Sequence, residues 1–92
     1  MVTVEFTRHL YTFFPDLDGR RIEVSGETVA QVIRGMEQIA PGLEFCVCDE
    51  HGRLRQHVNI FVGDEPVSDR GTLSDAVAPG SRVLILQALS GG

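Results

Sequence analysis

The chain has 92 residues, of which 42% are hydrophobic and 23% charged, and its formal net charge is −5. A chain of this length forms one domain with a single core and leaves little room for a deep cleft. The acidic balance argues against nucleic-acid binding, which rests on clustered basic residues, and suits docking onto a basic protein surface.

Neither a targeting segment nor a membrane span is indicated by the sequence. The first ten residues contain charges and no apolar signal region, and no apolar run approaches the about 18–20 residues needed to cross a bilayer. With two cysteines and no secretory signal, we expect no disulfide framework. We therefore expect a cytoplasmic protein that binds neither membrane nor nucleic acid.

Two paired strands are predicted at the start of the chain. Val2, Val4 and Phe6 alternate with polar residues, which is the period of a half-buried strand. Turn-forming residues at positions 15–19 lead to a second strand from about Arg21 to Val24. The two strands and their connection predict an antiparallel hairpin.

The next segment predicts the main helix. Thr28 and Gln31 have the spacing of a capping box, and Pro41-Gly42 ends the pattern. Gly35 indicates either a loose helix or a close approach to the sheet, and the sequence leaves both open. Apolar residues at helical intervals form one stripe: Val29, Val32, Ile33, Met36 and either Ile39 or Ala40.

The second half of the chain predicts strands over Leu43–Cys48 and Leu54–Val62, with a tight turn at positions 63–66. Thr72–Val77 is expected to form one helical turn. The last strand, Arg82–Leu86, is almost continuously apolar and is therefore expected in the middle of a sheet.

This order of elements predicts an α+β fold. One main helix, with a short second one, covers one face of a mixed four- to five-stranded sheet. The last strand lies centrally and parallel to the first, which is the β-grasp (ubiquitin-like) arrangement. We expect the domain to span residues 1–86 and a flexible tail to span 87–92.

Three stretches of the chain resemble the ubiquitin-like sulfur carriers of the MoaD/ThiS family. They are LRQHVNIFVGDE at 54–65, TLSDAVAPGSRVLIL at 72–86 and the diglycine tail ALSGG at 88–92. The chain length and the segment HVNIFVGDE look closest to the carriers of cysteine biosynthesis and to larger MoaD-like members. Gln87 departs from the pattern, because the family usually has Pro there.

The resemblance implies that the reactive group is the carboxylate of Gly92. An ionised carboxylate is a poor electrophile, so ATP must first convert it into an acyl-adenylate. An E1-like adenylyltransferase would supply the nucleotide site and Mg²⁺, and a sulfur donor would then convert the terminus into a thiocarboxylate for a downstream sulfur-accepting enzyme. The chain itself would be a co-substrate and not an enzyme, with no cofactor or metal of its own.

The tail residues suit entry into a narrow partner site. Gly91 and Gly92 lack Cβ, Ala88 and Ser90 are slim, and Leu89 is the one bulky residue that could anchor the tail. An exposed sheet face could hold the partner, and Phe61 and Leu86 are the candidate docking residues.

Other functions compete with the carrier hypothesis. A protein modifier joined to lysines through Gly92 would share the activation step, and a β-grasp binding module would need no covalent chemistry. All eight basic residues are Arg, so the chain cannot form lysine-linked polymers, which favours a carrier. The destination of the sulfur stays open between molybdopterin, thiazole, cysteine and a modified nucleoside.

A metal site is the last alternative. Cys46 and Cys48 lie two apart on a predicted strand, with His51 nearby. Two thiolates and one imidazole fall short of a closed tetrahedral set, so we favour strand cysteines without a metal.

Overall fold

The computed structural model describes residues 1–87, apart from the side chain of His9. Five strands form one sheet: β1 (Val2–Phe6), β2 (Ile22–Val24), β3 (Val58–Val62), β4 (Glu65–Pro66) and β5 (Arg82–Gln87). The helices are α1 (Arg8–Tyr11), α2 (Val29–Ile39), α3 (Leu43–Val47) and a 3₁₀ turn, η1 (Pro15–Leu17).

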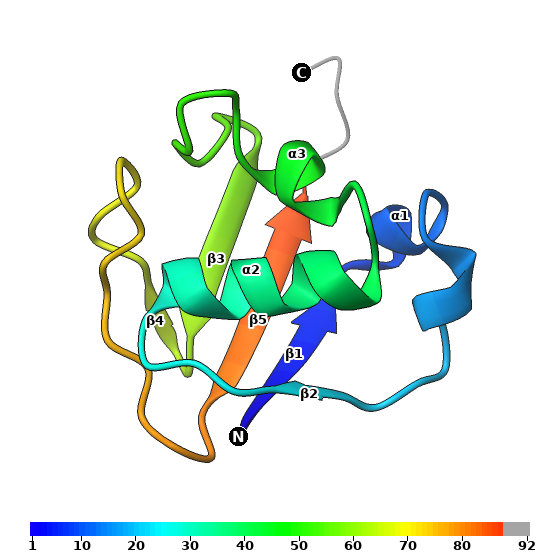
Figure 1. The fold of residues 1–92 in the computed structure, drawn as a ribbon, viewed down its shortest axis with the longest axis horizontal. Coiled ribbons are helices and arrows are strands. Elements are labelled where there is room, and N and C mark those ends of the chain that lie inside the picture. The colour runs from blue at the N-terminus through cyan, green and yellow to red at the C-terminus, as the bar shows by residue number, and fades with distance from the viewer. Residues whose placement is uncertain (88–92) are drawn as a thin grey trace.

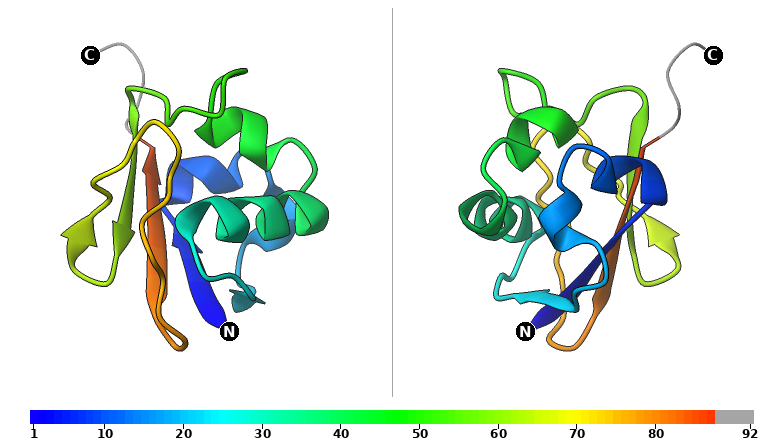
Figure 2. Two further views of the ribbon diagram at one scale, coloured as in Figure 1. Left: turned by 60° about the vertical axis from the view of Figure 1, so that its left-hand side comes forward. Right: turned by 90° about the vertical axis from the view of Figure 1, so that its right-hand side faces the viewer.

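The strand order in the sheet is β2-β1-β5-β3-β4, so β5 is the central strand. β5 runs parallel to β1 and antiparallel to β3, and β1 pairs antiparallel with β2. The helices lie on one side of the sheet, with α2 crossing it, and the other side is left open (Figures 1 and 2). The predicted β-grasp arrangement is confirmed.

The core lies between α2 and the sheet. Val83 and Ile85 of β5 are fully buried there, whereas Leu84 and Leu86 point to the open face and are only half-buried. The apolar residues of β5 therefore alternate between two environments. Val83 and Ile85 lie in the core, and Leu84 and Leu86 lie on the face of the sheet that is exposed to solvent.

The main helix begins as predicted at Thr28. Its Oγ1 accepts a hydrogen bond from the Gln31 backbone N–H at 3.3 Å. The Gln31 side chain accepts from the Glu27 N–H at 2.8 Å, one residue before the position that a capping box would use. The predicted stripe is buried, and its last member is Ala40, 6% exposed, rather than Ile39, 39% exposed.

Gly35 lies close to the sheet. A Cβ placed on this residue would lie 3.4 Å from Cβ of Val24 on β2, which is ordinary van der Waals contact. Because Ala is also the better helix former, we expect Gly35→Ala to raise the free energy of unfolding by about 0.5–1 kcal/mol. Urea denaturation measures this change, and a lower midpoint would show that the contact with Val24 is too tight.

The strand predicted over Leu43–Cys48 is wrong, because the segment forms α3. Gly42 enters it with φ of 99°, and the Glu37 carboxylate accepts from the backbone N–H groups of Gly42 and Glu44, both at 2.9 Å. These two bonds hold the pKa of Glu37 below its ordinary value. The carboxylate also supplies acceptors for N–H groups at the start of α3. Such a helix of five residues has few internal backbone hydrogen bonds.

The helix predicted over Thr72–Val77 is also wrong. Leu73 adopts φ of 55°, which a right-handed helix excludes. The carbonyls of Leu73 and Asp75 instead accept from the first two N–H groups of α2, those of Ala30 (2.9 Å) and Val29 (3.0 Å). The segment stays irregular because its carbonyls cap another helix.

Two predicted elements are present in the structure, but their boundaries differ from the prediction. β3 begins at Val58, and Leu54 forms only an isolated bridge with Cys48. The predicted hairpin of β1 and β2 is present, but α1 and η1 lie within its connection.

Candidate docking face and tail exit

The last described residue, Gln87, still belongs to β5 and pairs with Val58. Its backbone N–H donates to Oγ1 of Thr7 at 3.3 Å. A proline, which the resemblance to the MoaD/ThiS carriers leads one to expect at this position, has no N–H to donate. The strand thus continues through the residue where the tail is predicted to start.

The predicted tail site lies outside the described residues. It comprises Ala88, Leu89, Ser90, Gly91 and Gly92, and their roles stay predictions.

Both predicted docking residues lie on the open face. Phe61 stands opposite Leu84 in the register of β3 and β5, and Leu86 stands opposite Asn59. Phe61, Leu84 and Leu86 are half-buried and belong to adjacent strands. We call these three residues the open-face patch; it ends beside the exit of β5, and its docking role stays a prediction.

A polar hollow of about 940 Å³ lies on the same face, towards β1 and β2. Arg20, Arg21 and Arg82 line it together with Glu5, whose carboxylate lies 3.6 Å from Nε of Arg82. An apolar patch with a charged margin is the usual composition of a protein–protein interface.

Arg70 fixes the start of β3 beside the open-face patch. Its guanidinium donates to Oδ1 of Asn59 at 3.0 Å and to the carbonyls of Arg55 and Val58 at 2.7 and 2.8 Å. Because Val58 and Asn59 pair with Gln87 and Leu86, these bonds support the strand that holds the end of β5.

Asp69 organises the loop between β4 and β5. Its carboxylate accepts from the hydroxyls and backbone N–H groups of Ser74 and Thr72, and from the N–H of Gly71. Hydrogen bonds from Ser74 and then Thr72 hold the pKa of Asp69 far below its ordinary value. No pattern in the sequence indicates this role, because Asp69 is one of several acidic residues in turn-forming segments.

A pH-dependent stability follows from the lowered pKa of Asp69. Its contribution is complete above the unfolded-state pKa of about 3.9 and is lost as the pH falls towards the folded-state pKa. We expect Asp69→Asn to destabilise the protein at pH 7, with a difference from wild type that shrinks by pH 3. Urea midpoints of both proteins at the two pH values measure this. A difference that stays constant would contradict the role of the ionised carboxylate.

The cysteines lie in and after α3 rather than on a strand. Cys48 is 4% exposed, and burial, aided by the nearby carboxylates of Glu44 and Asp49, raises the pKa of its thiol to about 11. Such a thiol is a weak nucleophile at neutral pH. Among the side chains that the structure describes, which leave out His9, no three His, Cys, Asp or Glu lie together as metal ligands. Within residues 1–87, no helix has the length and apolar character that crossing a bilayer requires.

Comparison with known proteins agrees with this architecture. The model of the ThiS family matches residues 5–92. The sulfur carrier protein CysO of Mycobacterium tuberculosis H37Rv is 37% identical over 81 residues, which cover 85% of this chain and 87% of that protein.

Solved structures give the same result. The crystal structure of Mycobacterium tuberculosis CysO matches with a TM-score of 0.81 at 35% identity, covering 97% of this chain and all of that one. A chain of the Amycolatopsis orientalis BexX/CysO complex matches over the full length of both chains, with a TM-score of 0.83 at 30% identity. SAMP1 from Haloferax volcanii, at 24% identity and a TM-score of 0.72, shares the fold and covers 99% of this chain and 98% of its own. The chain belongs to the ThiS family and is a CysO-like sulfur carrier protein.

Proposed function

We propose that this carrier holds sulfur as a thiocarboxylate on Gly92. The carboxylate attacks the α-phosphorus of ATP, which gives an acyl-adenylate and pyrophosphate. A donor persulfide attacks the carbonyl carbon and AMP leaves. A second donor thiol then attacks the donor sulfur of this acyl disulfide and breaks the S–S bond that came from the persulfide. This forms a donor disulfide and leaves –C(O)S⁻ on Gly92. The observation that carries the proposal is the family match, which runs through residue 92.

An E1-like adenylyltransferase is the proposed activating enzyme. It would supply the nucleotide site and Mg²⁺, because adenylation needs cationic groups that stabilise the charge on the phosphates. We assign no cofactor to the carrier itself, and we place the reaction in the cytoplasm, where ATP is available. A sulfur donor and a sulfur-accepting enzyme complete the set of partners. The complex of a CysO with BexX supports the view that carriers of this fold act by binding other proteins.

The open-face patch is the proposed docking surface for the activating enzyme. Its three side chains are apolar and half-buried, and no helix within residues 1–87 covers their side of the sheet (Figure 2). Leu86 directly precedes Gln87, the last residue of β5. An enzyme seated there would hold the carrier next to the point where residues 88–92 begin.

ATP–pyrophosphate exchange tests this function. The purified carrier and the E1-like enzyme encoded in the same genome are mixed with ATP and labelled pyrophosphate. We expect label to enter ATP only when both proteins are present. Exchange in the absence of the carrier would contradict the proposal. So would a lack of exchange with this carrier when the same enzyme preparation is active with another carrier.

A further inference from the structure

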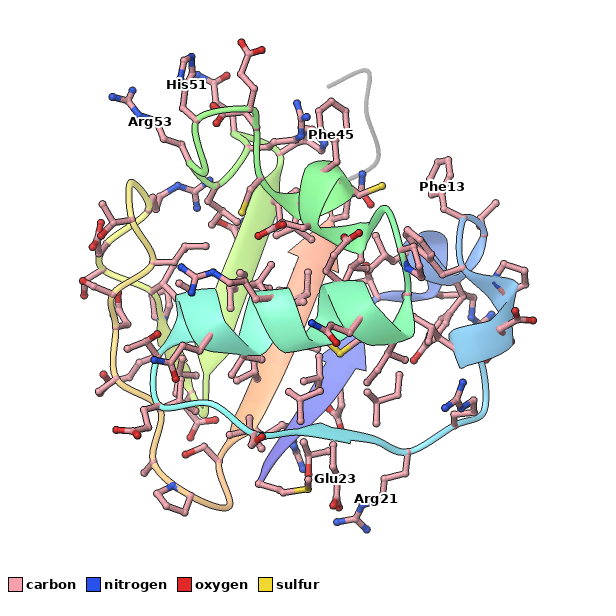
Figure 3. The ribbon with its side chains drawn as sticks, viewed as in Figure 1. Phe13, Arg21, Glu23, Phe45, His51 and Arg53 are labelled. Carbon is pink, nitrogen blue, oxygen red and sulfur yellow. The ribbon has the colours of Figure 1, made fainter. Side chains whose placement is uncertain are left out.

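Phe45 is an exposed aromatic residue held in a fixed position. Its side chain projects from α3 and is 67% exposed (Figure 3). The guanidinium of Arg55 lies over the ring, with Cζ 4.7 Å from the centroid, and Nε of Arg55 donates to the Phe45 carbonyl at 2.9 Å. The ring is therefore pre-ordered, which reduces the entropy lost when a partner binds it.

Folding does not require an apolar residue at this position. Leu43 and Val47, four residues apart, occupy the buried side of α3 and are both 0% exposed. Phe45 lies on the other side of the helix and leaves its apolar surface in water. Large aromatic residues and Arg are the types that contribute most at the centre of protein interfaces.

Acidic groups surround this ring. Two hollows of about 230 and 250 Å³ adjoin Phe45. Glu44, Asp49 and Glu50 line them, against the single guanidinium of Arg55. The Glu50 side chain is 82% exposed, and its carboxylate lies 3.7 Å from Nε2 of His51, so this acidic group stands at the surface where a partner can reach it. A complementary surface would present an apolar pocket with Lys or Arg side chains at its margin.

The position of α3 indicates which partner would meet it. α3 and the end of β5 lie at the same end of the molecule (Figures 1 and 2). α3 is on the helix side of the sheet, whereas the open-face patch is on the opposite side. An enzyme that takes up the chain beyond Gln87 must enclose this end, and so it can contact both sides.

We propose that Phe45, oriented by Arg55 and flanked by Glu44, Asp49 and Glu50, is a second docking contact for the activating enzyme. The ring inserts into an apolar pocket of the enzyme, and basic side chains at the margin of that pocket pair with the carboxylates. This inference rests on the proposed function and adds a surface that the open-face patch does not include.

The test is the KM for the carrier in ATP–pyrophosphate exchange with the E1-like enzyme. Phe45→Ala is expected to raise this KM about 10- to 30-fold with kcat unchanged, because it removes binding and leaves the reacting terminus intact. Phe13→Ala is the matched control: Phe13 is 57% exposed on the α1 side of the molecule, and its replacement should change KM less than about twofold. Thermal unfolding verifies that both variants are folded.

A charge reversal tests the acidic surroundings separately. Glu50→Lys should raise KM and weaken its dependence on salt, whereas Glu27→Lys, the same charge change at the start of α2, should not. An unchanged KM for Phe45→Ala, or a fall in kcat alone, would overturn the docking role. Failure of the wild-type carrier to support exchange would instead overturn the proposed function.

Discussion

One residue added after Gly92 is expected to reduce ATP–pyrophosphate exchange to the level seen without carrier. The addition moves the carboxylate about 3.3–3.6 Å further along the chain, past the point where it can meet the α-phosphorus. A misplacement of about 1 Å can already cost two orders of magnitude in rate. An added Ala also brings a Cβ into a channel proposed to accept glycine.

Two variants make this result specific. Adding Gly instead of Ala separates the effect of length from the effect of the side chain, and both should be inactive. Ser90→Ala keeps the length and the diglycine end, and it should retain exchange close to wild type. Full activity of either extended carrier, verified as untrimmed by mass spectrometry, would contradict a role for the terminal carboxylate.

Charges placed in the open-face patch should produce the second large effect. The double variant Phe61→Asp, Leu86→Asp is expected to raise the KM for the carrier at least about 30-fold, since truncation of a residue at the centre of an interface can cost about 2 kcal/mol or more and these changes also place two charges there. Both positions are half-buried on a face without a helix, so the core between α2 and the sheet is left intact.

The control for this variant lies on the same face of the sheet, on β1 and β3. Thr3→Asp and Asn59→Asp add equal charge on the open face outside the patch. They should affect KM much less, provided that circular dichroism shows all the proteins to be folded. Equal effects of the two pairs would indicate a general charge effect and contradict docking through the open-face patch.

The sequence predicts those parts of the fold that depend on local periodicity. The alternation of Val2, Val4 and Phe6 and the stripe on α2 each report one buried face, and the structure buries both. The apolar run Val83–Leu86 correctly indicates a central strand. Each pattern reflects the burial of one face of a strand or helix against the core. It therefore predicts that element without knowledge of the elements that pack against it.

The two wrong predictions concern segments whose conformation depends on hydrogen bonds with residues outside the segment. Leu43, Phe45 and Val47 alternate as a strand would, but the Glu37 carboxylate provides acceptors for α3. The segment 72–77 has helix-compatible residues, but its carbonyls are engaged by the start of α2. Local propensity is overridden in both places by hydrogen bonds from residues that are not adjacent in the chain.

The candidate site likewise contains residues that the sequence predicts and one residue that it does not. Phe61 and Leu86 could be named from sequence because they adjoin the tail in the chain or in the expected pairing, yet only the register places them on one face. Phe45 was missed because a strand would have pointed it to the same side as Leu43 and Val47. The signal that could have found it is the spacing of Leu43 and Val47 by four residues directly after Pro41-Gly42.

The mass of the intact carrier after reaction tests the central proposal most directly. The chain is incubated with the E1-like enzyme, ATP and a persulfide donor, and its C-terminal peptide is then fragmented. We predict a mass gain equal to the replacement of one oxygen by sulfur, located on Gly92 and dependent on ATP. An unchanged terminus, or recovery of the carrier only as conjugates to lysines of other proteins, would contradict the account.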